Sequence, residues 1–297
     1  MPASPINSPV LCFGEVLWDF LPHGTFPGGA PFNVAYHLHR LAVPVHPISA
    51  VGRDDLGEQL LQRLAQWGVS TSAISRHATL PTGRVSATLS PQGDAHYVIA
   101  RDVAWDRITL GPDTLKAAVT SPALVFGSLA LRSAENRAVL KQLIAALPVN
   151  AWRVFDVNLR APHDDLALVR EFASSANVLK LNATEAARWV DATESPGQEE
   201  SHARALAEQF KAALICITAG ERGAGLLRAD RWTWVSARRI AVADTVGAGD
   251  AFLAAFLCSL LRTAHTDTET LFAACRLGEW VAAHPGATPD YDATTPI

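Results

Sequence analysis

The sequence predicts an α/β fold in which a mostly parallel β-sheet is covered by helices on both faces. Short apolar runs alternate with longer segments of helical periodicity along most of the chain, which is the rhythm of βαβ units. The chain has 297 residues, of which 49% are hydrophobic and 18% charged, so it can bury a large core. Since ligands of such sheets bind beyond the carboxyl ends of the strands, the loops that follow the apolar runs are the first candidates for a functional site.

Each predicted element rests on one of two periodicities in the sequence. Eight short apolar runs bounded by turn residues are expected to be strands: residues 10–13, 45–51, 124–127, 152–157, 177–181, 214–218, 225–227 and 232–235. Eight longer segments with helical spacing are expected to be helices: residues 32–41, 55–67, 133–147, 164–174, 183–190, 199–211, 249–261 and 268–284. Their strict alternation over most of the chain favours a parallel sheet with crossover helices.

One segment breaks this rhythm. Residues 83–100 alternate with period two around the turn Pro91-Gln92-Gly93-Asp94, which predicts a β-hairpin instead of a crossover helix. A hairpin inserted into such a domain is either an edge extension or a lid over the site. The tail, residues 288–297, is expected to be loose.

The bulk composition argues against several classes of protein. The net charge is −4 and the sequence has no basic block, so nucleic acid is not the expected partner. The four cysteines, none in a C-x-x-C pair, are expected to be buried thiols. The first residues do not have the pattern of a signal peptide, and the longest apolar helix is too short to span a membrane. A cytoplasmic protein is expected.

The most informative stretch is 244–250, D-T-V-G-A-G-D, which opens directly onto an apolar helix. Gly247, Ala248 and Gly249 leave backbone N–H groups uncovered, and the helix directs its positive dipole end to the same place. An anion can bind there, and Asp250 stands beside it in the first helical turn. A carboxylate next to an anion site indicates proton handling, so the stretch suggests phosphoryl transfer to a hydroxyl with Asp250 as the base.

A second loop, residues 28–33 (G-G-A-P-F-N), follows the first strand and precedes a helix. Gly28 and Gly29 permit close backbone approach to a ligand, and Asn33 offers both a donor and an acceptor. Asp19, just past the first strand, could accept hydrogen bonds from two neighbouring sugar hydroxyls. The alternatives are an ordinary turn at residues 28–33 and a solvated loop residue at Asp19.

The stretch 156–160, D-V-N-L-R, sits at the carboxyl end of an apolar strand. Alternation directs Asp156, Asn158 and Arg160 to the same side while the strand lasts, and three polar groups there suit the binding of a polyol. The alternative is capping of the next loop.

Two further loops suit a nucleotide. Glu185 falls in the first helical turn after Asn182, where a carboxylate can hold Mg²⁺ through waters, although a simple capping pair fits nearly as well. Residues 218–225 are glycine-rich, but they match neither G-x-G-x-x-G nor a Walker A loop, and a turn between adjacent strands explains the glycines equally well.

Taken together and in order, these motifs resemble those of the ribokinase-type carbohydrate kinases, the phosphofructokinase B family. Residues 28–33 resemble the first signature of the family, residues 244–250 the second, and residues 182–185 its N-x-x-E motif. Residues 83–108 and the D-x-N-x-R stretch 156–160 are similar to those of bacterial fructokinases. The resemblance implies one ribokinase-like three-layer α/β/α domain over residues 1–297, with a small β-sheet lid formed by about 15–27 and 83–106.

The resemblance also assigns roles to individual residues. It implies that Asp250 is the general base and that the amides of Gly247, Ala248 and Gly249 bind the γ-phosphate as charge develops. The residues implied to hold the sugar are Asp19, Gly28, Gly29, Asn33 and Arg160. Those implied to bind ATP are Asn182, Thr218, Gly220, Gly223 and His284. Glu185 is implied to organise Mg²⁺ through water, and Asp244 and Thr245 to lie near a monovalent cation such as K⁺.

The expected function is an ATP-dependent sugar kinase that converts fructose to fructose 6-phosphate. Within the family, 2-keto-3-deoxygluconate, ribose and nucleosides stay open, because Phe32 and His284 depart from the usual small or amide residues at their positions. A catalytically silent sugar- or nucleotide-binding regulator is the alternative of another class. A dinucleotide oxidoreductase is disfavoured, since no G-x-G-x-x-G follows the first strand. A homodimer through the lid is a further expectation from the resemblance.

Overall fold

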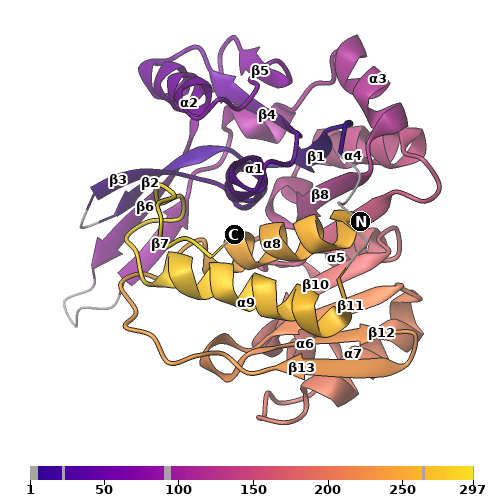
Figure 1. Ribbon diagram of the computed structural model, residues 1–297. Coiled ribbons are helices and arrows are strands. Elements are labelled where there is room, and N and C mark those ends of the chain that lie inside the picture. Colours follow the sequence, from indigo (N-terminus) through magenta and orange to yellow (C-terminus); the bar gives the residue numbers. More distant parts are fainter. Residues whose placement is uncertain (1–5, 22–23, 90–94, 263–264, 297) are drawn as a thin grey trace.

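A computed structural model describes residues 6–21, 24–89, 95–262 and 265–296, without the side chains of 87–89 and 95–97. Nine strands form the main sheet in the order β13-β12-β11-β10-β9-β8-β1-β4-β5 (Figure 1). Their bounds are β1 Val10–Phe13, β4 Val45–Gly52, β5 Ile74–His77, β8 Ala123–Gly127, β9 Trp152–Asp156, β10 Val178–Asn182, β11 Leu214–Thr218, β12 Ala224–Arg228 and β13 Arg231–Val235. All neighbours are parallel except β11–β12 and β12–β13, which confirms the mostly parallel sheet.

A separate four-stranded sheet lies to one side of the main sheet (Figure 1). Its order is β3-β2-β6-β7, and its strands are β2 Leu17–Leu21, β3 Gly24–Gly28, β6 Gly83–Leu89 and β7 Ala95–Ile99. The hairpin expected at 83–100 is present as β6 and β7, although its turn at 91–94 lies outside the described residues. This small sheet is built from the segments expected to form the lid. Its action as a lid stays a prediction.

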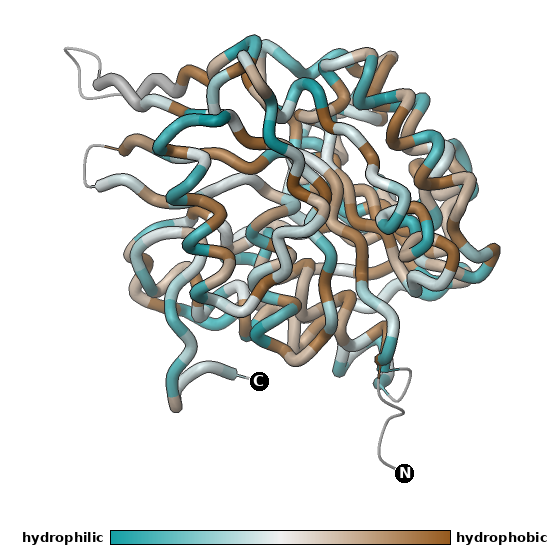
Figure 2. The backbone as a smooth tube through the Cα atoms, turned by 90° about the horizontal axis from the view of Figure 1, so that it is seen from above, coloured by the Kyte–Doolittle hydropathy of each residue, from teal (hydrophilic) through white to brown (hydrophobic). Residues whose placement is uncertain are grey.

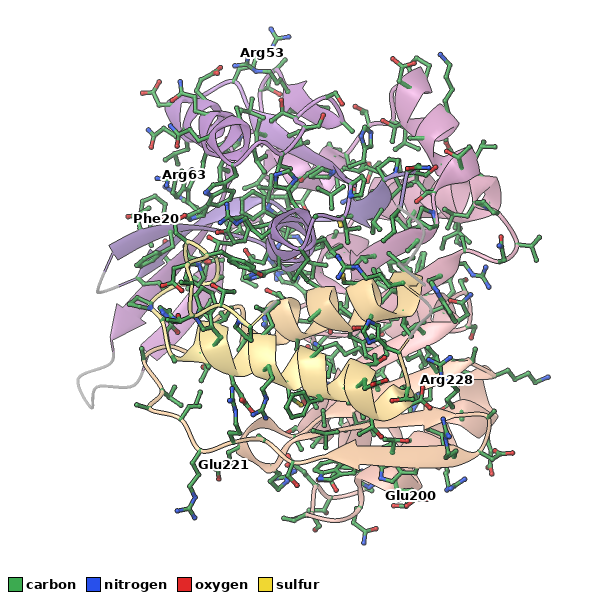
Figure 3. All side chains as sticks on the ribbon, viewed as in Figure 1. Phe20, Arg53, Arg63, Glu200, Glu221 and Arg228 are labelled. Atoms are coloured by element: carbon green, nitrogen blue, oxygen red, sulfur yellow. The ribbon has the colours of Figure 1, made fainter. Side chains whose placement is uncertain are left out.

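Helices cover both faces of the main sheet, which makes three layers (Figure 1). Their bounds are α1 Ala30–Arg40, α2 Asp55–Gln66, α3 Pro112–Thr120, α4 Ala134–Ala146, α5 Leu166–Ala173, α6 Ala183–Trp189, α7 Glu199–Phe210, α8 Ala248–Arg262 and α9 Asp267–Ala282. Strand residues alternate between two apolar cores: Val10 and Cys12 pack with residues of α1, α8 and α9, whereas Leu11 and Phe13 pack with residues of α4 to α7. The hydrophobic segments, brown in Figure 2, accordingly run mostly through the interior of the molecule. Charged side chains such as Arg53 and Glu221 project outward (Figure 3).

The helix α8 decides where the glycine-rich loop 244–250 is held. It is apolar nearly all round, and residues 250–260 are all buried. A helix of this kind needs neighbours on several sides, and α1 and α9 supply them together with the sheet. The start of α8 is therefore fixed on the main sheet.

The elements predicted from periodicity are all present, with ends shifted by no more than two residues. Periodicity alone missed β2, β3, β5 and α3, although the resemblance already implied a small β-sheet that includes residues 15–27. The edge strand β5 is short and buries only Ile74, so it carries almost no apolar pattern. The strands β2 and β3 complete the small sheet by pairing with each other and with the distant β6, which the local pattern does not show.

The expectation of a loose tail is wrong for the described part of the tail. The hydroxyl of Tyr36 donates to the carbonyl of Pro289 at 2.7 Å, and the hydroxyl of Tyr291 lies 2.9 Å from Nδ1 of His37. Tyr291 also stacks edge-on against Trp280. These contacts fix the tail against α1 and α9.

Two other expectations can be compared with the structure. The four cysteines, Cys12, Cys216, Cys258 and Cys275, are buried and free, as predicted. In the part of the chain that the structure describes, no helix combines the length and apolar character needed to cross a membrane.

Candidate active site

The first turns of α1 and α8, which are 217 residues apart in the sequence at Asn33 and Asp250, meet through these two side chains. Nδ2 of Asn33 donates to Oδ2 of Asp250 at 2.8 Å, and both side chains are buried. Asn33 is carried by α1, which begins after Gly29, whose φ of 115° favours glycine. Oδ1 of Asn33 is buried and has no partner among the described residues. A buried acceptor without a partner is costly, so this oxygen is ready for a hydroxyl of a ligand.

The surroundings of Asp250 suit a general base. The pKa of its carboxyl is raised to about 7, because burial and, second, the nearby carboxylate of Asp156 outweigh the lowering effect of the hydrogen bond from Asn33 and of the cations Lys180 and Arg160. A base is most effective when its pKa lies close to the working pH. The start of α8 therefore carries a buried carboxyl with a near-neutral pKa.

The loop before α8 is held tightly in its turn. Gly247 has a φ of 77°, and a Cβ there would lie 2.5 Å from Cα of Ala287. Asp244 joins this loop to the segment that holds Ala287. Its Oδ1 accepts from the amide of Val246 at 3.0 Å, and its Oδ2 accepts from the amide of Gly286 at 3.2 Å. The first turn of α8 follows at Ala248, whose amide donates to the carbonyl of Thr245 at 3.3 Å, so the positive end of the helix dipole lies at this loop.

Asp19 lies on strand β2, so it is not the solvated loop residue that was one alternative. Its carboxylate lies against Gly28, where a Cβ would come within 2.1 Å of Oδ2. Burial raises the pKa of Asp19 to about 6, and Arg160 lowers it. The side chain of Arg160 is exposed and lies close enough to influence the pKa of both Asp19 and Asp250. Arg160 thus lies between Asp19 and the pair formed by Asn33 and Asp250 in the network of interactions.

Sequence reasoning missed Glu15, which lies beside this group. Its side chain is 4% exposed, Oε1 accepts from the amide of Ala30 at 3.1 Å, and Oε2 has no partner among the described residues. Burial raises its pKa to about 7. A glutamate in the loop directly after the first strand was the available signal.

The strand alternation from which a common orientation of Asp156, Asn158 and Arg160 was expected is absent. Strand β9 ends at Asp156, and Asn158 has a φ of 39°, so the alternation stops before it reaches Arg160. The carboxylate of Asp156 is buried and accepts two hydrogen bonds from Nζ of Lys180, each 2.9 Å long. Lys180 was also missed, although a lysine inside an apolar strand was visible in the sequence.

A cavity of about 570 Å³ opens at the carboxyl ends of β10 and β11, and we call it the carboxyl-end cavity. Its wall is lined by Leu159, Arg160, Ala161, Asp164, Asn182, Ala183, Thr184, Glu185, Arg188, Glu194, Thr218, Ala219 and Gly220. Asn182 and Glu185 form a reciprocal capping box at the start of α6, and Oε1 of Glu185 also accepts from the amide of Leu159 at 2.7 Å. The capping alternative is therefore present in the structure, and it holds the carboxylate in the cavity wall.

The remaining predicted nucleotide residues differ in position. Thr218 and Gly220 line the carboxyl-end cavity. Gly223 does not line it: its φ is 126°, and a Cβ there would lie 2.1 Å from the carbonyl oxygen of Val235, as the turn alternative requires. His284 lies after α9, where Nδ1 is 2.7 Å from the carbonyl oxygen of Trp280.

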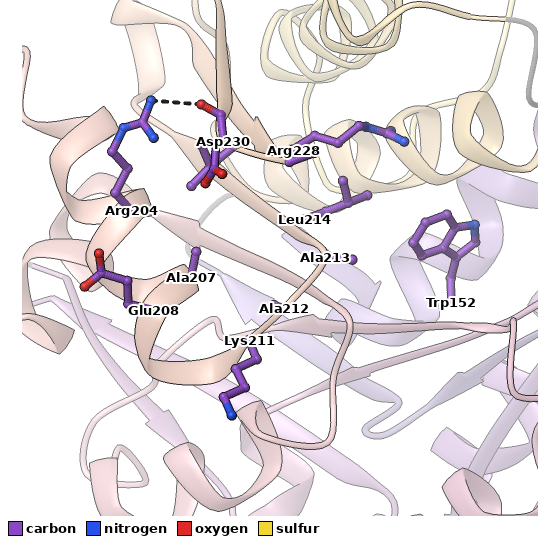
Figure 4. A pocket seen from close by; sticks show the side chains of 12 residues that line it. Trp152, Arg204, Ala207, Glu208, Lys211, Ala212, Ala213, Leu214, Arg228 and Asp230 are labelled. Carbon is purple, nitrogen blue, oxygen red and sulfur yellow. Dashed lines mark hydrogen bonds between the residues drawn. The ribbon is translucent and has the colours of Figure 1, made fainter.

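A second cavity, of about 580 Å³, lies at the opposite edge of the sheet, and we call it the amino-end cavity (Figure 4). It is lined by Trp152, Arg204, Ala207, Glu208, Lys211, Ala212, Ala213, Leu214, Leu227, Arg228, Ala229 and Asp230. None of the predicted site residues lies in it, so the motifs select the carboxyl end of the sheet.

Comparison with known proteins identifies the family. Residues 23–294 match the family described as pfkB family carbohydrate kinase. This chain belongs to that family. The protein is accordingly a carbohydrate kinase, a transferase that phosphorylates a sugar.

Individual relatives of the kinase share its length and fold. An uncharacterized sugar kinase of Pyrococcus horikoshii is 30% identical over 237 residues, 80% of this chain and 74% of the relative. Its crystal structure in complex with ATP matches with a TM-score of 0.77 over 94% of both chains. The fructokinase of Salmonella typhimurium is 29% identical over 266 residues, 86% of this chain and 85% of the relative. A crystal structure of fructokinase from Vibrio cholerae with fructose, ADP and a calcium ion has 24% identity and a TM-score of 0.82 over 96% of both chains. The kinase thus has the ribokinase-like α/β fold.

Proposed function

We propose that this kinase transfers the γ-phosphate of ATP to the primary hydroxyl of fructose and forms fructose 6-phosphate and ADP. The observation that carries the proposal is the hydrogen bond between Asn33 and Asp250. This bond joins residues 28–33, proposed to hold the sugar, to residues 244–250, proposed to hold the phosphate. The two substrates would thereby meet at a buried carboxylate whose pKa is about 7.

The proposed chemical step needs little covalent work from the protein. Asp250 accepts the proton of the sugar hydroxyl, the hydroxyl oxygen forms a bond to the γ-phosphorus, and the bond from that phosphorus to the bridging oxygen of ADP breaks. Negative charge spreads over the transferred phosphoryl group, where the amides of Gly247, Ala248 and Gly249 would receive it. The proton stays on Asp250 until it is released to solvent.

The sugar is proposed to lie between the two sheets. Asp19 and the unpartnered Oδ1 of Asn33 are acceptors for its hydroxyls, and Arg160 is a donor. The backbone at Gly28 and Gly29 lets the ligand approach closely. Closure of the small sheet over the sugar is part of the proposal, as is a homodimer through its strands, which analytical ultracentrifugation would test.

ATP is proposed to bind in the carboxyl-end cavity along Asn182, Thr218 and Gly220. Gly223 and His284 do not line this cavity and are proposed to contact ATP outside it.

Mg²⁺ fits the donors in the cavity wall as an ion held through water. Each carboxylate oxygen of Glu185 accepts one backbone amide, from Leu159 or Asn182. The second lone pair of each oxygen can accept a hydrogen bond from a water molecule that the ion holds. Within the described ranges, no group of three or more His, Cys, Asp or Glu residues could hold a metal ion by itself. When bound, the ion would neutralise charge on the phosphates. A monovalent cation near Asp244 and Thr245 belongs to the proposal as well.

Other sugars of the same class are the main competing proposals. A 2-keto-3-deoxygluconate kinase is favoured by one observation, the exposed guanidinium of Arg160, which could pair with a substrate carboxylate. Ribose and nucleosides also present a primary hydroxyl. A catalytically silent binding protein is the competing proposal of another class, and the near-neutral pKa of Asp250 argues against it.

A screen of ATP consumption tests these proposals together. The purified chain is assayed with fructose, 2-keto-3-deoxygluconate, ribose and adenosine at equal concentrations. The proposal predicts the highest kcat/KM with fructose and a product phosphorylated at position 6. A higher kcat/KM with another substrate contradicts the choice of sugar, and no turnover with any of them contradicts the kinase proposal for this site.

A further inference from the structure

A buried ion pair lies beside residues 244–250, which we call the anion loop, and it has no role in the mechanism proposed above. Lys180 and Asp156 stand opposite each other on the neighbouring strands β10 and β9. Nζ of Lys180 donates to both carboxylate oxygens of Asp156 at 2.9 Å, and the side chains are 8% and 5% exposed. The ammonium is therefore fixed in position.

The next neighbour of this ammonium is the start of α8. A Cβ built on Gly249 would lie 3.4 Å from Nζ of Lys180. Gly249 is itself exposed, so one side of the residue is open to a ligand while Lys180 lies on the other. A fixed positive charge thus stands behind the amides that are proposed to receive the γ-phosphate.

Lys180 is also the cation in a group of buried carboxylates. Asp156, Glu185 and Asp250 are 3%, 7% and 8% exposed, and all three interact electrostatically with Lys180. Although burial opposes the charge of Lys180, these carboxylates, Asp156 foremost, raise its pKa above the usual value, so the ammonium stays charged.

Stability alone does not explain this pair. The desolvation of two buried charges offsets most of their attraction, and an apolar pair of the same volume often stabilises a protein equally well. A perturbed, buried cluster of charges next to a candidate site is more typical of function.

We propose that Lys180 is a positioning residue for phosphoryl transfer, which presents a fixed positive charge to the phosphoryl group through the start of α8 and is held there by Asp156. This inference rests on the proposed roles of Asp250 and the anion loop. A preorganised cation near developing negative charge lowers the barrier, since it needs no rearrangement when the reaction occurs. It acts in the transition state more than in the binding of the sugar.

The charges that face Asp250 determine how its pKa, and with it the pH profile of the reaction, should respond to loss of Asp156 or Lys180. They are Asp156 on β9, Lys180 on β10 and Arg160 in the loop after β9, while α1 contributes the neutral Asn33. On α6, Glu185 faces Lys180 and Asp156.

Two more acidic groups, Asp19 on β2 and Asp244 before α8, face each other across the same site. Loss of Asp156 alone therefore removes a like charge from Asp250 and moves the acid limb of the pH profile of kcat/KM to lower pH. Loss of Lys180 and Asp156 together removes one charge of each sign and leaves that limb nearly in place.

The decisive experiment compares Asp156→Asn with the double variant Lys180→Met/Asp156→Asn. The single Lys180→Met variant is avoided, because it leaves a buried carboxylate without a counter-ion and is expected to unfold. The double variant keeps the volume and removes both charges. Each protein is assayed with saturating MgATP and the best sugar from the screen, and its melting temperature is measured.

The proposal predicts that the double variant keeps a melting temperature near that of the parent and a KM for the sugar within about twofold. Its kcat falls about 10²-fold, the scale of a lost electrostatic contact to the transition state. Asp156→Asn, which keeps the cation, retains kcat within about tenfold and shifts the acid limb to lower pH. A matched control is Lys141→Met, which removes an exposed lysine paired with Glu171 and leaves kcat unchanged.

Two results would overturn the inference while leaving the kinase proposal intact. One is a double variant that keeps kcat within about threefold of an active parent, because the pair would then be only structural. The other is an equal loss of kcat in Asp156→Asn and in the double variant, because the effect would then not come from the lysine. A parent that turns over no sugar would overturn the proposed function, and this inference with it.

Discussion

The carboxyl-end and amino-end cavities of the main sheet have nearly the same volume, about 570 and 580 Å³, yet they differ in chemistry. At the carboxyl end, α6 begins at Ala183 in the cavity wall, so the positive end of its dipole lies at the cavity. At the amino end, α7 finishes at Phe210 and offers its carbonyl end. An anionic substrate is favoured by the first environment and disfavoured by the second.

The charged residues of the two cavities are also arranged differently. At the amino end, Arg204 pairs with Glu200 and donates to the carbonyl of Asp230 (Figure 4), and Arg228 pairs with Asp267. These ion pairs are partly exposed and behave as ordinary surface pairs. At the carboxyl end, burial raises the pKa of Glu185. Volume alone does not distinguish the cavities, whereas helix direction and buried charge do.

The largest expected effect is on catalysis at the start of α8. Asp250→Asn removes the proton acceptor but preserves the shape of the side chain, so kcat is expected to fall about 10²–10⁴-fold with little change in ATP affinity. Steady-state kinetics and calorimetric titration of ATP measure the two quantities. The control is Lys211→Met in the amino-end cavity, which is expected to keep the parent kcat. Near-parental turnover of Asp250→Asn would remove this residue from the base role.

The second prediction concerns the shape of the anion loop. Gly247→Ala places a Cβ against Ala287 at a φ of 77°, which costs on the order of 1–3 kcal/mol of stability. Displacement of the loop amides is expected to lower kcat about 10²-fold. Urea unfolding and kinetics test it, with Gly197→Ala as a control: its φ of 85° gives similar strain, but an added Cβ there would meet no atom within 4 Å. Equal losses of kcat in both variants would refute a specific role of the loop.

The third prediction concerns pH. The folded pKa of Asp250 lies at about 7, so the base is protonated below this pH and ionised above it. kcat/KM for the sugar is therefore expected to fall about tenfold per pH unit below about pH 7 and to level off above it. A profile from pH 5.5 to 8.5 measures the limb. A limb near pH 4 would show that burial does not perturb the catalytic carboxyl.

The smallest expected effect is on the metal. Glu185→Gln keeps the shape of the capping residue and removes its charge, so the Mg²⁺ concentration for half-maximal rate is expected to rise about tenfold. Kinetic titration with Mg²⁺ measures it, and Glu208→Gln in the amino-end cavity is the matched control. An unchanged titration would exclude Glu185 from the metal site.

The fold could be predicted further than the site. Local periodicity located the main parallel strands and their helices, because each buries one apolar pattern against its neighbours. Periodicity alone did not locate β2 and β3, since β2 pairs with the distant β6 and β3 pairs with β2; only the resemblance implied a small β-sheet there. The site motifs around Gly28 and Asp250 were visible because they depend on small residues at fixed spacing. The partnership of Asp156 with Lys180 was not, because it joins two strands that are far apart in sequence.

Hydrogen exchange with a non-hydrolysable ATP analogue, fructose and Mg²⁺ tests the choice between the two cavities most directly. Bound substrates are expected to slow exchange of the amides of residues 182–185, 218–220 and 247–250, at the carboxyl end of the sheet. Residues 211–214 and 228–230, in the amino-end cavity, are expected to exchange as in the free protein. Protection of this second set without the first would contradict the assignment of phosphoryl transfer to the carboxyl-end cavity and the start of α8.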